Sequence, residues 1–274
     1  MDRDSAAPSY TFRDHDLAAK RLALVAETFS PLTIALLNEA VTDQPSVAVD
    51  LGCGLRHSTR TISTVATPRR IIGLDQSETF LSRARKTTTG NVDFIVHDVT
   101  RLPIPGAPAD LLFCRFLLVH LPEPEDLIQR WLTQLKPGGL LLVQETEGIT
   151  SVNPTITRYL EVVEGLLASR GASLNVGPRL AGVGASADSA SVINRTTMMS
   201  VPISRAASMF DMNLQAWHDD PYILNRYSPT DVAELEHEFI HLTEQDSVDL
   251  VQWTFREMTL RRPTDTANAT TPPA

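Results

Sequence analysis

A glycine-rich turn follows the apolar run 47–51, whose one polar residue is Asp50. Gly52 and Gly54 allow positive φ angles and carry no Cβ atoms, so a ligand can approach the backbone closely. Residues 55–59 then open a predicted helix, whose free N–H groups and positive dipole end face the same place. The turn therefore predicts a binding site for a small molecule.

Two further carboxylates close the next two apolar runs. Asp75 ends the run 71–75, about 25 residues after Asp50, and Asp98 follows the run 92–97. In open α/β sheets, ligands bind at the carboxyl ends of the strands. A carboxylate at Asp75 suits a ribose diol, and one at Asp98 suits an exocyclic amine. Together the three acidic strand ends predict a nucleoside pocket.

Short apolar runs alternate with helix-like segments through the first half of the chain. This alternation predicts βαβ units and a parallel sheet with helices on both faces. The predicted strands are 47–51, 71–75, 92–97, 111–115 and 140–144. A helix is expected over 125–135, and Lys136-Pro-Gly-Gly139 is typical of a helix stop and turn.

The remaining segments show a weaker pattern. Helical spacing over 16–29 predicts one helix, and Ser30-Pro31 predicts the start of a second. The other expected elements are a helix over 154–170, a loop or short broken helix over 173–189, a strand over 191–200, a helix over 228–242 and an edge strand over 248–260. No internal repeat is found.

The amino-acid composition indicates which kinds of molecule the protein binds. The 274 residues are 42% hydrophobic and carry a formal charge of −9. Basic residues cluster no further than pairs such as Arg69-Arg70, which argues against nucleic acid and favours a small-molecule acceptor. No uninterrupted apolar stretch approaches about 20 residues, so we expect no membrane partner and a cytoplasmic protein. Cys53 and Cys114 are expected to be free buried thiols.

Several motifs stand in a familiar order. They are Asp50–Thr59 (DLGCGLRHST), Gly73–Phe80 (GLDQSETF), His97–Val99, Asp110–Leu121 and Leu135–Leu140. In these residues the chain resembles class I S-adenosylmethionine-dependent methyltransferases, especially the small-molecule, natural-product subgroup. The resemblance is strong over about 40–147 and looser beyond.

The resemblance implies a fold and a domain plan. The fold is α/β, a Rossmann-like doubly wound, mostly parallel seven-stranded sheet with an antiparallel C-terminal edge strand and a helical lid. The expected parts are an N-terminal helical lid segment (1–40), the S-adenosylmethionine-binding core (41–147), a substrate-recognition insertion (148–230) and a C-terminal helix and edge strand completing the core (231–262). The tail (263–274), which is rich in Thr, Ala and Pro and has no apolar period, is expected to be disordered.

The resemblance also implies residues around the methionine end of the cofactor. Gly52 and Gly54, with Cys53 between them, would contact the aminoacyl part, and Asp50 would lie beneath its amino group. Arg115 would offer its backbone carbonyl to the cofactor ammonium, with its side chain available to the acceptor.

At the nucleoside end, the resemblance implies that Asp75 holds the ribose hydroxyls. Gln76 and Phe80 would flank adenine. Asp98 would accept from the adenine amino group, and the backbone N–H of Val99 would meet a ring nitrogen. S-adenosyl-L-methionine is thus the expected cofactor, and we expect no metal site.

Candidates for the chemistry itself are fewer. His120 is either a base near the methyl group or a structural histidine at a helix start. Glu145 and Glu147 either orient an acceptor or are solvated edge charges. Simple packing competes with acceptor contact for each lid residue that could line the acceptor site: Tyr10, His15, Tyr159, Trp217, His218 and Tyr222.

Arg56 stands where the family's third glycine is usual. One interpretation directs it outward or onto the cofactor carboxylate, and the other is a pocket that has drifted. The bulk of Arg56 and His57 also disfavours a nicotinamide cofactor, because the loop that binds its pyrophosphate is tight at a third glycine.

The expected function is methyl transfer to an O, N or C nucleophile of a small organic acceptor in secondary metabolism. Two alternatives stay open: a non-methylating reaction of the cyclase or pericyclase type, and a non-catalytic binding partner. Homodimerisation through the N-terminal helices or the C-terminal edge strand is also left open.

Overall fold

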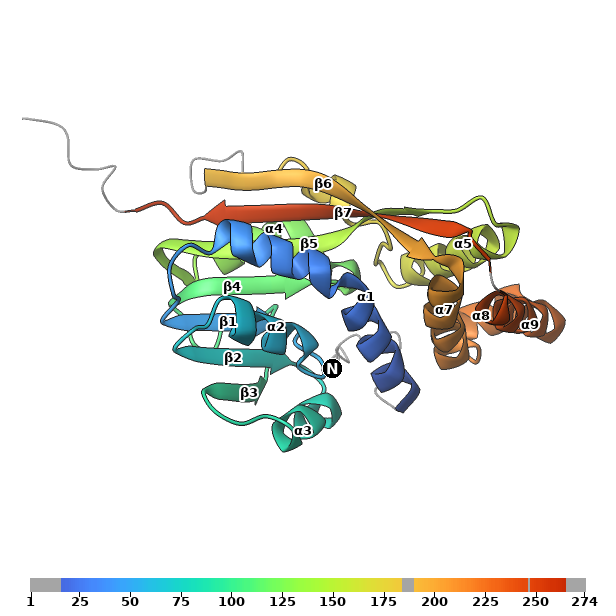
Figure 1. Ribbon diagram of the computed structural model, residues 1–274, viewed down its shortest axis with the longest axis horizontal. Coiled ribbons are helices and arrows are strands. Elements are labelled where there is room, and N and C mark those ends of the chain that lie inside the picture. Colours follow the sequence, from blue (N-terminus) through green and yellow to red (C-terminus); the bar gives the residue numbers. More distant parts are fainter. Residues whose placement is uncertain (1–15, 184–189, 246, 265–274) are drawn as a thin grey trace, which may run out of the picture. The chain divides into compact units, whose positions relative to one another are not determined.

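The computed structural model describes residues 16–183, 190–245 and 247–264 (Figure 1). Its centre is a seven-stranded sheet with the order β3-β2-β1-β4-β5-β7-β6. The strands are β1 (Val47–Leu51), β2 (Arg70–Asp75), β3 (Val92–Val96), β4 (Ala109–Arg115), β5 (Leu135–Thr150), β6 (Ala190–Pro202) and β7 (Leu250–Arg261). β1 pairs in parallel with β2 and β4, as do β2 with β3 and β4 with β5. This seven-stranded sheet, mixed but with a parallel core and helices against it, confirms the predicted fold class.

The helices described are α1 (Asp16–Ala40), α2 (His57–Val65), α3 (Glu78–Lys86), α4 (Pro124–Leu132), α5 (Pro154–Ala168), α6 (Gly177–Leu180), α7 (Ile203–Trp217), α8 (Pro221–Arg226) and α9 (Pro229–Glu244). A short 3₁₀ turn, η1, covers Leu118–His120. The helices over 16–29, 125–135, 154–170 and 228–242 were expected from the sequence, whereas α7 and α8 were not. Trp217 and Tyr222 fall in those two unexpected helices.

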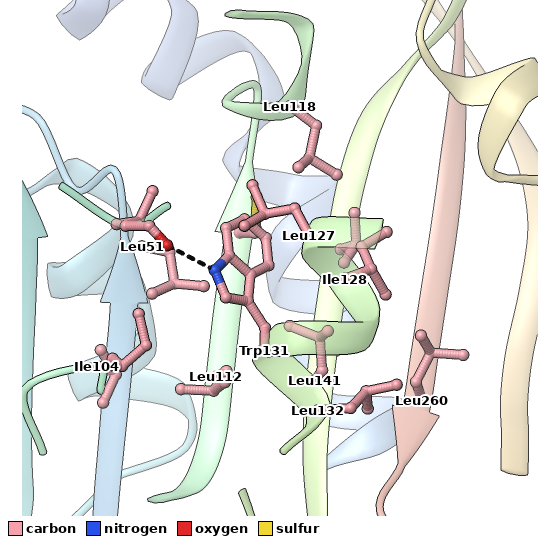
Figure 2. Close-up of a cluster of buried hydrophobic side chains, with 14 of the residues drawn as sticks. Leu51, Ile104, Leu112, Leu118, Leu127, Ile128, Trp131, Leu132, Leu141 and Leu260 are labelled. Carbon is pink, nitrogen blue, oxygen red and sulfur yellow. Dashed lines mark hydrogen bonds between the residues drawn. The ribbon is translucent and has the colours of Figure 1, made fainter. Parts of the chain in front are cut away.

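Period-two burial gives the parallel strands two apolar faces. Ala48 and Phe113 face one side and pack with Leu36 and Leu37 of α1 and Ile62 of α2. The residues next to them in each strand, such as Val49 and Leu112, face the other side of the sheet, where Trp131 of α4 is completely buried (Figure 2). The indole nitrogen of Trp131 donates to the Val99 carbonyl at 2.9 Å, which joins α4 to the segment after β3. The carboxyl ends of β1, β2 and β3 are therefore held by a packed layer on each side.

Two expectations about chain breaks were wrong. α1 is one helix that continues through Pro31, because Phe29, Leu36 and Leu37 are buried on both sides of the proline. Lys136-Pro-Gly-Gly139 is no turn but part of β5. Leu135 pairs with Ala109 and Leu140 with Leu111, so the extra residues form a bulge. Gly138 has a φ of 80° there, which a glycine adopts without strain.

The strand expected at an edge over 248–260 lies inside the sheet instead, so this expectation was wrong. β7 lies between β5 and β6, so β6 is the outermost strand at this end. Residues 257–260 of β7 are all buried, which fits a strand with a neighbour on each side. The expected strand over 191–200 corresponds to β6.

The chain divides into two compact units, each built from three segments. Of the described residues, one unit comprises 29–147, 175–183, 190–197 and 254–264, and contains the parallel strands. The other comprises 16–28, 148–174, 198–245 and 247–253. α9 belongs to this second group, whereas we expected it to complete the sheet domain. Within this group, Tyr159 stacks on Phe210 at 4.3 Å and lies edge-on to Phe239 at 5.4 Å, forming a separate aromatic core.

One described helix, α1, is long and apolar enough to span a membrane by length and composition alone. Core helices of water-soluble proteins pass the same test, and Leu36 and Leu37 are fully buried against the sheet. The absence of a membrane partner stays a prediction.

Candidate functional site

The glycine turn after β1 has the backbone geometry that its sequence predicts. Gly52 and Gly54 have φ angles of 68° and 51°. A Cβ atom on Gly52 would lie 2.8 Å from Leu117 Cδ1, so Leu117 packs directly on the turn. Cys53 is buried, and its N–H donates to the Leu74 carbonyl at 2.9 Å, which ties the turn to β2. The site is thus fixed from two neighbouring strands.

Asp50 anchors the helix that follows the turn. Its Oδ2 accepts hydrogen bonds from Ser58 at 2.7 Å and Thr59 at 2.6 Å, both in the first turn of α2. Burial raises the pKa of Asp50 to about 6, against the opposing effect of these two hydrogen bonds. Asp50 therefore sets the position of α2 relative to β1, and its expected place beneath the cofactor amino group stays a prediction.

Asp75 joins the glycine turn to α3. Its Oδ2 accepts from the Gly54 N–H at 2.8 Å, and its Oδ1 accepts from the Ser77 N–H at 2.9 Å. Ser77 in turn caps α3 by accepting from the Phe80 N–H at 3.1 Å. A carboxylate offers about four acceptor positions, and both oxygens of Asp75 accept from backbone N–H groups of this site. Phe80 is buried, with only 3% of its surface exposed.

Asp98 is held as a charged acceptor at the end of β3. Burial alone would raise its pKa, but hydrogen bonds from Thr100 and Gln76 and the charge of Arg101 hold that pKa below its usual value. Thr100 donates both its hydroxyl, at 2.7 Å, and its N–H, at 3.0 Å. The carboxylate is therefore ionised at neutral pH and can accept from an amine.

The sheet register brings the three carboxylates to one edge. Asp50 pairs with Gly73 of β2, and Asp75 pairs with Val96 of β3, just before Asp98. Each strand thus ends beside its neighbour with an acidic group at or near its carboxyl end. The sequence predicted this juxtaposition, and it provides hydrogen-bond acceptors suited to a ribose and an amine next to an open backbone turn.

Comparison with known proteins finds one family that matches the region around the glycine turn. Residues 49–143 match the family described as "Methyltransferase domain". Trans-aconitate 2-methyltransferase of Methylobacterium nodulans is 35% identical over 141 residues, which is 52% of this chain and 54% of that protein. Residues 49–143 are therefore similar to a methyltransferase domain. The chain spans about half the length of the curated relatives that it matches.

Solved structures share the fold of the methyltransferase domain across most of the chain. A candidate methyltransferase of Bacillus halodurans aligns with a TM-score of 0.56 and 15% identity, covering 84% of this chain and 99% of its own. Phosphoethanolamine N-methyltransferase 2 of Haemonchus contortus, solved with S-adenosylhomocysteine, aligns with a TM-score of 0.52 and 16% identity, covering 91% and 60%. At these identities the likeness concerns the fold alone.

Arg56 is directed away from the glycine turn, toward α3. Its backbone takes the left-handed conformation, with φ 76° and ψ 9°, as a glycine would at this position. Its Nε donates to Thr87 Oγ1 at 2.8 Å, at the C-terminal end of α3. Of the expected alternatives, the outward orientation therefore describes the side chain. The hydrogen bond to Thr87 offsets part of the cost of a side chain at positive φ, about 1 kcal/mol.

Arg115 is the basic residue at the end of β4. Its Nη1 donates to Thr33 Oγ1 in α1 at 2.8 Å, and its guanidinium lies 5.7 Å from the Phe116 ring centre. Burial lowers the pKa of Arg115 to about 10, although the charges of Asp50 and Glu145 raise it. The side chain is thus a charged group that is only partly solvated.

The two catalytic candidates lie just beyond β4 and in β5. Glu145 is completely buried, and its Oε1 accepts from the Leu117 N–H at 2.8 Å and the Leu118 N–H at 2.9 Å. This contact holds the segment that leads into η1. His120 ends η1 and is partly buried. Glu147 forms a two-point ion pair with Arg256, at 2.7 and 2.9 Å. Contact of any of them with an acceptor stays a prediction.

The lid candidates divide by exposure. Tyr159 and Trp217 are each 1% exposed, and the Tyr159 hydroxyl accepts from Asn213 at 2.9 Å. His218 is exposed at the end of α7, and Tyr222 is partly buried in α8. Packing accounts for Tyr159 and Trp217, whose role toward an acceptor stays a prediction. Tyr10 and His15 lie outside the described residues.

Sequence reasoning missed the polar groups behind the site. Ser58 and Thr59 bind Asp50, and Thr33 links Arg115 to Gln144, whose Oε1 accepts from the Thr33 hydroxyl at 2.7 Å. The position of Thr59 at the end of the first motif was the available signal. Nothing local marks Thr33, which is 111 residues from Gln144 in the chain.

Proposed function

We propose that this protein is an S-adenosylmethionine-dependent methyltransferase acting on a small organic acceptor. One observation carries the proposal: Asp75 accepts from the Gly54 N–H of the glycine turn, and the charged acceptor Asp98 lies at the next strand end. Two carboxylates beside a turn of positive φ fit an adenosine joined to an amino acid. The methyltransferase family of residues 49–143 supports the same cofactor.

The residues of this chain bind and orient in this proposal. Asp75 accepts from the ribose hydroxyls, Asp98 accepts from the adenine amino group, and Phe80 and Gln76 border the base. Gly52 and Gly54 let the backbone approach the aminoacyl end. When bound, S-adenosylmethionine supplies a methyl group on a positively charged sulfur, which is already a strong electrophile. The protein then accelerates transfer chiefly by holding the acceptor nucleophile in line with that methyl group.

The acceptor is proposed by class. Trans-aconitate, the acceptor in the name of the relatives from Methylobacterium nodulans and Azoarcus, is the first compound to assay. The resemblance to natural-product enzymes adds secondary metabolites to the assay. His120 is retained as a candidate base, whereas the Oε1 of Glu145 already serves two backbone N–H groups.

Calorimetric titration with S-adenosylhomocysteine tests the cofactor assignment. We expect binding to the wild-type protein and a loss of about 10- to 100-fold in Asp75→Ala, the range for hydrogen bonds to a charged group. Asp93→Asn is the matched control, because Asp93 is an exposed carboxylate of β3 paired with Arg70. Absence of binding to the wild type, or equal binding by Asp75→Ala, would refute the proposal.

Mass spectrometry of the product tests the reaction. A product heavier than the acceptor by one methyl unit supports transfer. An isomer of unchanged mass contradicts it and indicates a non-methylating reaction on the same fold.

A further inference from the structure

The Arg115 guanidinium has hydrogen-bonding capacity that the protein does not use. A guanidinium carries five N–H donors. Within the described ranges, Arg115 makes one hydrogen bond, from Nη1 to Thr33, and no ion pair with a carboxylate; Asp50 and Glu145 act on it only through space. Burying a charge without partners costs free energy that a bound anion would recover. The unused donors therefore indicate an anion site.

The sheet register places Arg115 beside the glycine turn. Leu51 pairs with Cys114, so the next residues along the two strands, Gly52 and Arg115, lie level with each other. Arg115 is two positions after Phe113, on the face that Asp50 shares. Its charge acts on both Asp50 and His57, which flank the turn on either side. The guanidinium thus lies at the end of the site where the aminoacyl group is expected.

The other basic residues near the turn are less suited to bind an anion. Arg56 donates its Nε to Thr87, away from the turn. Burial, together with the charges of Arg115, Arg56 and Arg60, lowers the pKa of His57, which favours its neutral form. Arg60 is exposed on α2. Arg56 and Arg115 are both partly buried, and each makes one hydrogen bond within the described residues, but only the charge of Arg115 acts on Asp50 as well as on His57.

We infer that the Arg115 side chain binds the carboxylate of the methionine moiety of the cofactor. The inference rests on the proposed function and assigns to Arg115 the role that the sequence alone offered to Arg56. A planar guanidinium can bind a carboxylate through two parallel hydrogen bonds, which fixes the orientation of the amino acid as well as its affinity.

Two ligands that differ only by the carboxylate test this assignment. S-adenosylhomocysteine and its decarboxylated analogue share the adenosine, the thioether and the amine. We expect the wild type to bind S-adenosylhomocysteine about 10- to 100-fold more tightly than the analogue, the range for charge-assisted hydrogen bonds. In Arg115→Met this preference should fall to about twofold or less, with the affinity for the analogue unchanged.

Two further variants separate the role of the guanidinium from that of its charge and of its Thr33 partner. Arg115→Lys retains the charge without the planar fork, so it should keep part of the preference. Thr33→Val removes the partner hydroxyl but not the guanidinium, so it should keep most of the preference; circular dichroism checks the fold of each variant. A preference that persists in a folded Arg115→Met protein overturns the inference. Failure of the wild type to bind S-adenosylhomocysteine would instead overturn the proposed function.

Discussion

Substitution of Glu145 by glutamine should change how stability depends on pH. Burial raises the pKa of Glu145 to about 7 from an ordinary value of 4.5, despite hydrogen bonds from the Leu118 and Leu117 N–H groups. The folded protein therefore holds the proton more tightly than the unfolded chain. This proton contributes stability fully below pH 4.5, and the contribution is lost as the pH rises through about 7.

The magnitude follows from the size of the shift. One pKa unit corresponds to about 1.4 kcal/mol, so a displacement from 4.5 to about 7 is worth roughly 3 kcal/mol. Most of this change falls between pH 5 and pH 8. Glutamine keeps an acceptor oxygen for the Leu117 and Leu118 N–H groups but does not titrate. We therefore expect wild type to lose roughly 2 to 3 kcal/mol relative to Glu145→Gln as the pH rises from 5 to 8.

Urea unfolding at a series of pH values measures this difference directly. The difference between the two proteins cancels the titration of every group that they share, including Asp50. Asp93→Asn shows how an exposed, ion-paired carboxylate behaves over the same range. A wild-type minus variant difference that stays constant from pH 5 to pH 8 would show that Glu145 keeps one protonation state, and would refute the argument from burial.

Two other substitutions test packing and strain. Arg56→Gly should be more stable than Arg56→Ala by about 1 kcal/mol. Both variants lose the hydrogen bond to Thr87, but only glycine adopts a φ of 76° without strain. Thermal unfolding compares the two variants, and equal stabilities would contradict the argument from backbone strain. Trp131→Phe should lower the free energy of unfolding, measured in urea, by about 2 kcal/mol. The substitution leaves the buried Val99 carbonyl without its hydrogen-bond donor and opens a small void under α4. A loss below about 0.5 kcal/mol would contradict a stabilising role for that hydrogen bond.

The first five strands could be predicted because each is an apolar run between polar segments, and the site followed because parallel strands end at one edge. The bulge in β5 could not. Proline and two glycines are local signals of a turn, but pairing with β4 decides the outcome. From Leu135 to Leu140 the chain advances five positions while its partner advances two, from Ala109 to Leu111. Only the neighbouring strand reveals that the surplus is absorbed within the sheet.

The hydrogen-bond partners of the side chains could not be predicted for a related reason. The acidic residues were placed correctly because a strand end fixes the position of its own residue. The hydrogen-bond partner of a side chain, by contrast, can lie far away in the sequence. Arg56 and Thr87 are 31 residues apart, and Arg115 and Thr33 are 82 residues apart. A sequence pattern could name Arg56 as unusual, since it occupies a glycine position, but could not say which way its side chain lies.

The direction of hydrogen bonding behind Arg115 explains why its remaining donors stay available. Thr33 has one hydroxyl proton, which it gives to Gln144, so it can only accept from Arg115. The Gln144 Nε2 donates at 2.8 Å to the buried Glu257, which also accepts from Arg195 at 3.0 Å. Each acceptor oxygen in this series of hydrogen bonds thus receives its proton from a group other than the remaining N–H groups of Arg115. Within the described residues, this network uses one N–H of Arg115 to hold the side chain in place and engages no other N–H of the guanidinium. A carboxylate arriving at the glycine turn would therefore meet a cation that is already positioned.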